Sequence, residues 1–300
     1  MADVRQDVKN AILITGGTDG LGRATAVLLA EHGYRVFAGG RHPGKLAELG
    51  QLAHERELPL KPIELDVCSD ASIDRAFLEI ARSGSLIDVL VNNAGICIVA
   101  VMEEISIEDL RKQFETNFFG AVRMVQRVLP EMRRRGRGRI INMSSLSGKV
   151  VQPLWGPYAS TKYALEAISD AMRLELYPFN IQVVLVEPGY IATNIKNIAE
   201  ELSGAYAAGA EQSPYAGIYR PILKWLRSAN HSRSTPEDCA HVILRAVEDT
   251  PPRTRYPVTR GAKAWLLARR LLSDRALDHQ YRKMFGLNEL RAAIQKGAQG

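Results

Sequence analysis

The eight residues TGGTDGLG (15–22) stand between a short apolar run, AILIT, and a stretch with helical periodicity, GRATAVLLAEHG. Gly16, Gly20 and Gly22 permit a tight turn and let the backbone approach a phosphate group at the positive N-terminus of a helix. Their spacing is G-x-x-x-G-x-G rather than the commoner G-x-G-x-x-G. A glycine turn that joins a first strand to a first helix indicates a dinucleotide-binding unit.

The rest of the chain repeats this alternation of strand and helix. Short runs rich in β-branched residues predict strands at 11–16, 35–40, 61–67, 88–95, 139–145, 182–189 and 254–258. Apolar residues at three- and four-residue spacing predict helices within 22–33, 71–84, 107–136 and 161–180. Near-continuous apolar strands separated by helices predict an α/β fold, a doubly wound and mostly parallel Rossmann-like sheet of about seven strands with helices on both faces.

The composition is that of an ordinary globular protein, with 46% hydrophobic and 24% charged residues among 300. We predict a single NAD(P)-binding domain over 1–260, with a lid over the substrate at about 190–235, and a basic helical extension over 261–300. The chain has no apolar run of 18 residues, no secretion-signal pattern and three widely spaced cysteines. A cytoplasmic location is therefore expected.

The net charge of +6 invites a nucleic-acid hypothesis, but the charge is unevenly distributed. Residues 253–300 contain eleven Lys/Arg and three acids, a net charge of +8, which leaves −2 for residues 1–252. The basic segment contains no nucleic-acid-binding module, so no nucleic-acid partner is expected. The six histidines are scattered along the chain, and no metal site is expected either.

The end of the second predicted strand bears on the choice of dinucleotide. NAD binders usually hold an acid there for the ribose hydroxyl, and NADP binders an arginine for the 2′-phosphate. Gly40 occupies the position of the acid and Arg41 follows it, which favours NADP(H) over NAD(H). Asp19 in the glycine turn argues against this preference, because its carboxylate would repel the phosphate. A solvated loop cation is the alternative interpretation of Arg41.

Further motifs follow the predicted strands in order: NNAG (92–95), a serine pair (144–145), YASTK (158–162) and EPGYIAT (187–193). Together, T-G-x-x-x-G-x-G, N-N-A-G, a serine thirteen residues before Y-x-x-x-K, and P-G-x-x-x-T resemble the short-chain dehydrogenase/reductase family in its compact single-domain branch. The resemblance extends from Ala11 to Gly189 and more faintly to about residue 258. It implies hydride transfer between a nicotinamide and a carbonyl or carbinol carbon.

The resemblance also implies roles for individual residues. Tyr158 would be the general acid/base, and Lys162 the cation that lowers its pKa and holds the nicotinamide ribose. Ser145 would donate a hydrogen bond to the substrate carbonyl, with Ser144 and Ser147 left open as alternatives. Asn117 would anchor a water that relays protons from Lys162. The implied cofactor contacts are Gly16, Thr18, Asp19, Gly20, Leu21, Gly22, Arg41, Asp66, Val67, Asn93, Ala94, Gly95, Tyr158, Lys162, Pro188, Gly189, Ile191 and Thr193.

The spacing of Tyr158 and Lys162 supports this chemistry independently. Residues i and i+4 of a helix lie on one face, with their β-carbons about 5–6 Å apart. An ammonium about 4 Å from a phenolate attracts it by roughly 4 kcal/mol at an effective dielectric near 20. Because one pKa unit corresponds to about 1.36 kcal/mol, this attraction would bring the phenol from a pKa near 10 towards neutrality.

The substrate wall is expected from residues that follow the later strands, namely Ser145, Leu146, Trp155, Tyr158 and Tyr190. Few charges occur among them, and the predicted lid adds Tyr206, Tyr215, Tyr219 and Trp225. Apolar walls under an aromatic lid favour a bulky lipophilic ketone or alcohol, such as a steroid, a retinoid or a long-chain carbonyl compound. Packing within the lid is the alternative role for each of these residues.

The extension over 261–300 interleaves apolar residues with arginines and is similar to the C-terminal segments of steroid- and retinol-type members. Three arrangements stay open: peripheral contact with an anionic membrane, a cap on the substrate pocket, and packing against a second subunit. The family resemblance implies a homodimer or homotetramer. The alternative function is a non-catalytic dinucleotide-binding sensor or scaffold, because a fold alone does not give activity.

Overall fold

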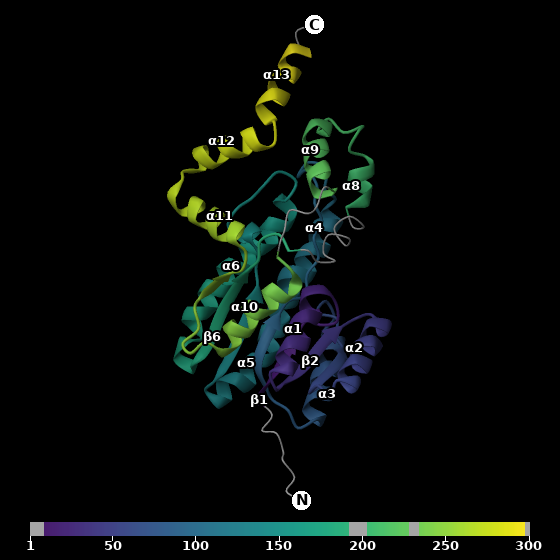
Figure 1. Ribbon diagram of the computed structural model, residues 1–300, viewed down its shortest axis with the longest axis vertical. Coiled ribbons are helices and arrows are strands. Elements are labelled where there is room, and N and C mark those ends of the chain that lie inside the picture. Colours follow the sequence, from purple (N-terminus) through teal and green to yellow (C-terminus); the bar gives the residue numbers. More distant parts are fainter. Residues whose placement is uncertain (1–8, 192–202, 228–233, 298–300) are drawn as a thin grey trace, which may run out of the picture.

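The computed structural model describes residues 9–191, 203–227 and 234–297, and places seven strands in one sheet (Figure 1). The strand order is β3-β2-β1-β4-β5-β6-β7, and every neighbouring pair is parallel. The strands are β1 (Lys9–Ile14), β2 (Tyr34–Gly40), β3 (Leu60–Glu64), β4 (Ile87–Asn92), β5 (Gly138–Met143), β6 (Ile181–Glu187) and β7 (Arg255–Pro257). The predicted doubly wound α/β fold is confirmed.

The alternation of side chains along β1 divides the core into two layers. Ile12 and Ile14 lie in one buried cluster, and Leu13 between them lies in the other. Both faces of the sheet therefore need apolar side chains, which is why the strands read as continuous apolar runs.

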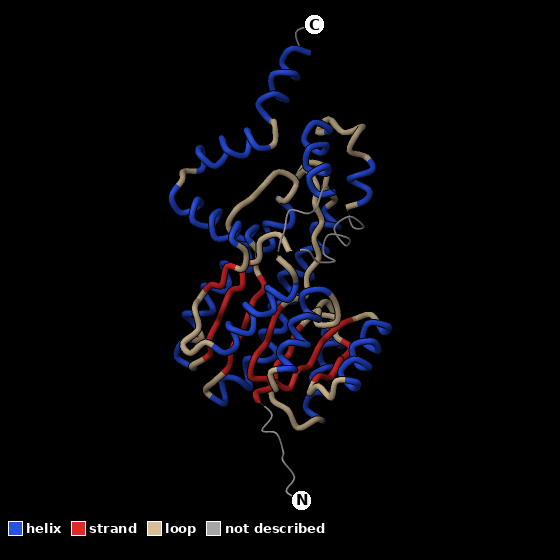
Figure 2. The backbone as a smooth tube through the Cα atoms, viewed as in Figure 1, coloured by secondary structure: helices blue, strands red, loops and turns tan. Residues whose placement is uncertain are grey.

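Helices cover both faces of the sheet, as Figure 2 shows. The helices that follow the first five strands are α1 (Gly20–Glu31), α2 (Pro43–Glu55), α3 (Asp70–Arg82), α4 (Ile107–Phe114), α5 (Gly120–Arg135) and α6 (Gly156–Glu175). Later helices are α8 (Gly204–Ala208), α9 (Ala216–Arg227), α10 (Pro236–Glu248), α11 (Arg260–Leu271), α12 (Asp274–Met284) and α13 (Leu287–Gly297). Helices α1, α2 and α10 pack on the face of Ile12, and α3, α5 and α6 pack on the face of Leu13.

The structure corrects the expected elements in two respects. Helices α2 and α10 were not predicted. Five predicted strands extend two or three residues too far, because the TG, LDV, NAG, SS and PG stretches are loops that begin where the strands end. The motifs therefore gather at the carboxyl edge of the sheet, where open α/β sheets bind their ligands.

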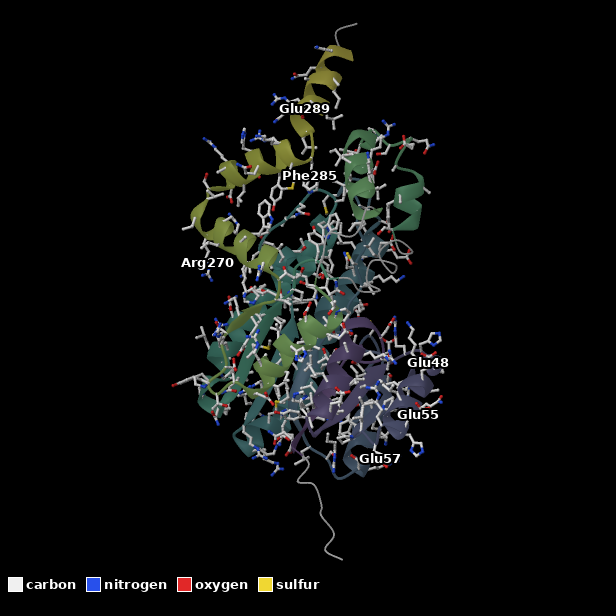
Figure 3. The ribbon with its side chains drawn as sticks, in the orientation of Figure 1. Glu48, Glu55, Glu57, Arg270, Phe285 and Glu289 are labelled. Atoms are coloured by element: carbon white, nitrogen blue, oxygen red, sulfur yellow. The ribbon has the colours of Figure 1, made fainter. Side chains whose placement is uncertain are left out.

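Helices α11 to α13 return over the same edge. A β-carbon on Gly189 would lie 2.4 Å from Oγ1 of Thr259, the N-cap of α11, and 3.3 Å from Ala262 Cβ, so the segment after β6 is in close contact with the start of the extension. Trp265 stacks on Tyr281 with ring centroids 5.2 Å apart. Figure 3 shows Arg270 and Glu289 on the outer side of this arm and Phe285 on its inner side.

Candidate active site

A cleft of about 630 Å³ opens at the carboxyl edge of the sheet. The loops after β1, β2, β3, β4, β5 and β6 all contribute to its wall. Of the eighteen residues named above as cofactor contacts, all that the structure describes line this cleft; Thr193 lies outside the described residues. The cleft is also lined by Gly40, His42, Pro43, Lys45, Leu65, Ile96, Thr116, Met143, Ser144 and Ser145.

The glycine turn has the shape of a phosphate cradle. A β-carbon on Gly22 would lie 2.0 Å from the carbonyl oxygen of Gly16, so the turn cannot close around any larger residue. Gly16 itself has a φ of +62°, which other residues rarely adopt. Asp19 caps α1, and its Oδ1 accepts a hydrogen bond from Gly20 N at 2.8 Å. The backbone fits a dinucleotide, with the pyrophosphate at the N-terminus of α1.

Thr15 holds the NNAG loop against this turn. Its Oγ1 accepts hydrogen bonds from the backbone N–H groups of Asn93 and Ala94, both at 3.0 Å. In return, Asn93 Nδ2 donates to the carbonyl oxygens of Thr15 and Gly16 at 3.0 and 3.1 Å. Thr15 was not among the predicted site residues, although it opens the motif from which the fold was predicted.

Ser145, Tyr158 and Lys162 meet on one wall of the cleft. Tyr158 and Lys162 lie four residues apart in α6, as predicted, and the Lys162 Nζ is 5.7 Å from the centroid of the Tyr158 ring. The Ser145 hydroxyl lies near the Tyr158 phenol and favours its ionised form. Ser145 Oγ accepts a hydrogen bond from Ser147 N at 3.1 Å; Ser144 and Ser145 line the cleft, whereas Ser147 is not among its lining residues.

The electrostatics of this group differ from the expectation. Burial raises the pKa of Tyr158 above its ordinary value of 10, and the neighbouring Ser145 hydroxyl opposes that shift. Burial also lowers the pKa of Lys162 to about 8. Lys162 Nζ donates to the carbonyl oxygen of Met143 at 2.7 Å. Proximity to Lys162 therefore does not lower the pKa of the phenol below 10 in the chain alone, because removing the phenolate from water costs more.

Asn117 lies behind this wall in a π-helical turn, Glu115–Phe119, that joins α4 to α5. The residue is 2% exposed, and its side chain makes three hydrogen bonds. Asn117 Oδ1 accepts from Ile96 N at 2.8 Å, and its Nδ2 donates to Ile96 O at 2.9 Å and Thr161 Oγ1 at 3.1 Å. The residue thus ties the NNAG loop to α6, one residue before Lys162.

Charged residues surround the other end of the cleft, where the second strand ends. Arg41 Nη1 lies 3.9 Å from Asp66 Oδ2, and Lys45 Nζ lies 2.5 Å from Asp19 Oδ2. Lys45 was not predicted as a site residue, because it belongs to α2, a helix that sequence periodicity did not indicate. A basic residue four positions after Arg41 was the available signal.

Of the predicted substrate residues, Ser145 and Tyr158 line the cleft, whereas Leu146, Trp155 and Tyr190 are not among its lining residues. Leu146 and Trp155 are buried, and the Trp155 and Tyr190 rings meet edge to face at 6.4 Å. Leu146 shares an apolar cluster with Ala262 and Tyr281 of the C-terminal extension.

The described part of the predicted lid is attached both through apolar packing, with Tyr219 and Ile222 in the buried cluster around Tyr158, and through tyrosine hydroxyl groups. Tyr219 OH donates to Glu104 Oε2 at 2.7 Å and accepts from Val101 N at 3.1 Å. Tyr206 OH donates to Asp109 Oδ2 at 2.5 Å, and Tyr215 OH donates to a carboxylate oxygen of Glu103. Helices α8 and α9 are therefore anchored to the segment between β4 and α4. The side chain of Trp225 lies outside the described residues.

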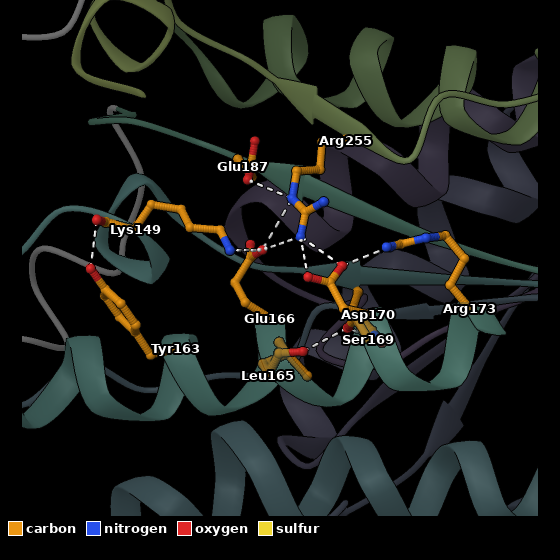
Figure 4. Close-up of polar contacts among 10 residues, drawn as sticks. Lys149, Tyr163, Leu165, Glu166, Ser169, Asp170, Arg173, Glu187 and Arg255 are labelled. Carbon is orange, nitrogen blue, oxygen red and sulfur yellow. Dashed lines mark hydrogen bonds and ion pairs between the residues drawn. The ribbon is translucent and has the colours of Figure 1, made fainter. Parts of the chain in front are cut away.

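A partly buried charge network lies further along α6, beginning one helical turn after Lys162, and Figure 4 shows its contacts. Arg255 of β7 contacts Glu166 at 3.1 Å and Asp170 at 2.7 Å, both on α6, and approaches Glu187 at 3.5 Å. Lys149 Nζ reaches Glu166 at 3.2 Å. Glu166 follows Lys162 by one helical turn, so the helix that carries the reactive side chains is joined to the last strand.

Within the described ranges, no three His, Cys, Asp or Glu side chains are grouped as metal ligands. No helix among the described residues has both the length and the apolar character that a bilayer span requires.

Three relatives illustrate the similarity to known proteins. The chain is 36% identical to an uncharacterized oxidoreductase, YusZ, of Bacillus subtilis (strain 168), over 88% of this chain and 94% of the relative. It is 36% identical to retinol dehydrogenase 8 of Bos taurus, over 85% and 83%. It is 34% identical to 3-ketodihydrosphingosine reductase of Bacteroides thetaiotaomicron, over 85% and 92%.

Solved structures of dehydrogenases are also similar to this chain. A short-chain dehydrogenase from Streptomyces avermitilis superposes with a TM-score of 0.73 at 28% identity, covering 98% of this chain and 97% of that one. A gluconate 5-dehydrogenase from Burkholderia cenocepacia in complex with NADP and tartrate gives 0.68 at 25% identity, covering 85% and 95%. The family model described as short chain dehydrogenase matches residues 10–202. The chain is therefore a member of the short-chain dehydrogenase/reductase family of nicotinamide-dependent oxidoreductases.

Proposed function

We propose that the protein is an NADP(H)-dependent oxidoreductase that interconverts a lipophilic ketone and its secondary alcohol, or an aldehyde and its primary alcohol. The observation that carries this proposal is that Ser145, Tyr158 and Lys162 line one cleft shaped for a dinucleotide, with the Lys162 ammonium 5.7 Å from the centroid of the Tyr158 ring. A non-catalytic sensor does not need these three groups together.

The bound nicotinamide supplies or accepts the hydride. In the reducing direction Ser145 donates a hydrogen bond to the carbonyl oxygen, and Tyr158 donates the proton that this oxygen takes up. Lys162 holds the ribose, and its charge together with that of the oxidised nicotinamide stabilises the phenolate that remains. This second cation is needed because burial alone raises the pKa of Tyr158. Asn117 keeps Lys162 in register by binding both Ile96 and Thr161, and anchors the relay water.

The preference for NADP(H) rests on the adenosine end of the cleft. Gly40 cannot supply an acid for the ribose hydroxyl, and Arg41 follows it with 65% of its side chain exposed. The structurally similar gluconate 5-dehydrogenase binds NADP.

A lipophilic substrate is supported by the apolar cluster around Tyr158, which includes Cys97, Val99, Leu154 and Trp155. Two relatives are described as a retinol dehydrogenase and a 3-ketodihydrosphingosine reductase, names that refer to lipophilic compounds. The proposal for this chain is the class of compound, not either of these substrates.

Residues 1–260 form one domain in this proposal, with the lid at 190–235 closing over the substrate and the extension 261–300 capping the same end from the other side. The inner side of the extension carries Phe285, which packs on the cluster around Tyr158. Its outer side exposes Leu271 by 74% beside Arg270. Sedimentation with anionic vesicles tests the proposed peripheral membrane contact of this outer side, and gel filtration tests the proposed homodimer or homotetramer.

The decisive experiment follows NADPH absorbance while the protein is offered steroid, retinoid and long-chain ketones and aldehydes. We expect carbonyl-dependent oxidation of NADPH, faster for the lipophilic compounds than for sugars of equal carbonyl reactivity. Binding of NADPH without turnover across such a panel would favour the sensor instead.

A further inference from the structure

Asp19 and Lys45 form a contact that removes an objection to NADP(H). Asp19 lies in the glycine turn, where a free carboxylate would repel a 2′-phosphate. Lys45 Nζ lies 2.5 Å from Asp19 Oδ2, and the two side chains are 41% and 32% exposed, respectively. Both residues line the dinucleotide cleft. The carboxylate therefore faces the adenosine end with its charge already compensated.

The position of Lys45 in the fold also favours an anion. Lys45 lies in the first turn of α2, whose N-cap residue His42 makes no side-chain capping hydrogen bond. The first N–H groups of that helix thus add a positive partial charge next to the ammonium. Arg41, His42 and Pro43 line the same stretch of the cleft. Two cations and a helix N-terminus converge there.

We infer that Lys45 is a specificity-determining residue, which neutralises Asp19 and shares the 2′-phosphate of NADP(H) with Arg41. This inference rests on the proposed preference for NADP(H) and extends it to a residue in another element. Charge-assisted hydrogen bonds to a phosphate are among the stronger ones, even when they are partly exposed. The phosphate is absent from NADH, so Lys45 discriminates between the two dinucleotides rather than binding both.

The test compares the full-length protein with three variants, Lys45→Gln, Asp19→Asn and the double variant, by fluorescence titration with NADPH and NADH. An asparagine in the place of Asp19 preserves the cap of α1, because its side-chain oxygen accepts the same hydrogen bond. Lys61→Gln is the matched control: Lys61 Nζ lies 2.8 Å from Glu79 Oε1, at comparable exposure but away from the cleft.

We expect Lys45→Gln to weaken NADPH binding by about 10- to 30-fold and to leave NADH binding within about twofold. Asp19→Asn should strengthen NADPH binding. When Lys45→Gln is added to Asp19→Asn, the loss of NADPH affinity should be smaller than in the wild-type background. The control should change neither affinity.

The inference is overturned if Lys45→Gln weakens both dinucleotides equally or leaves NADPH unaffected. The wild-type protein tests the proposed preference separately. Tighter binding of NADH than of NADPH by the unmodified chain would reject that preference, whereas a selective loss of NADPH binding in Lys45→Gln would still establish the role of Lys45.

Discussion

Gly40 and Thr18 are packed so closely that a β-carbon on Gly40 would lie 2.2 Å from Thr18 Oγ1. Position 40 is where NAD-binding relatives of this fold place an acid for the ribose hydroxyl. Here no side chain fits at that position unless Thr18, which is 6% exposed, moves away. The absence of an acid after β2 is thus part of the packing of the glycine turn.

Replacing Gly40 with Asp should therefore not convert the protein to NADH. We expect Gly40→Asp to weaken the binding of both dinucleotides and to lower Tm, because the new side chain displaces Thr18. Thr18→Gly combined with Gly40→Asp should recover NADH binding. Titration and thermal unfolding of the two variants measure this; a gain of NADH affinity in Gly40→Asp alone would contradict the packing argument.

Removal of the Tyr158 hydroxyl should abolish most turnover. We expect Tyr158→Phe to lower kcat by about 10²- to 10⁴-fold, the usual contribution of general acid–base catalysis, with an unchanged Kd for the dinucleotide. Tyr163→Phe is a matched control, since Tyr163 lies on the same helix and its hydroxyl donates to Lys149 O at 2.5 Å. Equal losses in both variants would assign the effect to the helix rather than to the phenol.

The Arg255 guanidinium should contribute strongly to stability. Arg255→Met leaves the buried carboxylates of Glu166 and Glu187 without this partner, and we expect the free energy of unfolding to fall by about 2–4 kcal/mol. Arg56→Met, which removes a surface ion pair with Glu31, should cost less than about 1 kcal/mol. Urea unfolding of both variants measures the difference, and equal losses would mean that the network is not buried in solution.

The carboxyl of Glu187 gives the stability a pH dependence. Burial raises its pKa from an ordinary 4.5 to about 7. The folded chain then binds this proton more tightly than the unfolded chain, so the contribution to stability is complete below the unfolded pKa and is lost as the pH rises through the folded pKa.

Relative to Glu187→Gln, the wild-type free energy of unfolding should fall by about 2–3 kcal/mol between about pH 4.5 and pH 8. Guanidinium unfolding across this range tests the difference between the two proteins. A parallel pH dependence would show that Glu187 titrates normally.

The hydroxyl of Tyr219 should matter for the substrate and not for the dinucleotide. Tyr219→Phe leaves Val101 N–H without its acceptor and Glu104 Oε2 without its donor, at a cost of about 1–3 kcal/mol to the anchoring of α9. We expect a several-fold increase in the KM of the carbonyl substrate and an unchanged KM of NADPH. Steady-state kinetics measure the two KM values separately. An unchanged substrate KM would show that the lid does not form part of the substrate site.

The strands and their order of motifs were predictable because both faces of the sheet are buried and each strand is a short apolar run. Helices α2 and α10 were not predicted. Lys45 was not predicted as a site residue, because α2 was not predicted and because its role depends on a contact with Asp19 in another element. Sequence spacing places Lys45 near Arg41 but carries no information about the glycine turn.

The contacts of the lid and the pKa of the Tyr158 phenol could not be predicted from sequence spacing either. Tyr206, Tyr215 and Tyr219 were expected to offer aromatic surface, and each also bonds through its hydroxyl to an acid about a hundred residues earlier in the chain. Spacing likewise brought Tyr158 and Lys162 to one helix face. It could not weigh the burial that opposes ionisation, because burial is set by the whole fold.

Helix α6 has 20 residues and is therefore about 30 Å long. Tyr158 and Lys162 lie near its N-terminal end, and Glu166 and Asp170 further along bind Arg255 of β7. Detachment of β7 would let α6 tilt. A displacement of the Tyr158 phenol by a fraction of an ångström is enough to impair proton transfer to the substrate. On warming, turnover should therefore decline before the bulk of the helical signal is lost. The attachment of β7 to α6 therefore sets the temperature above which turnover is lost.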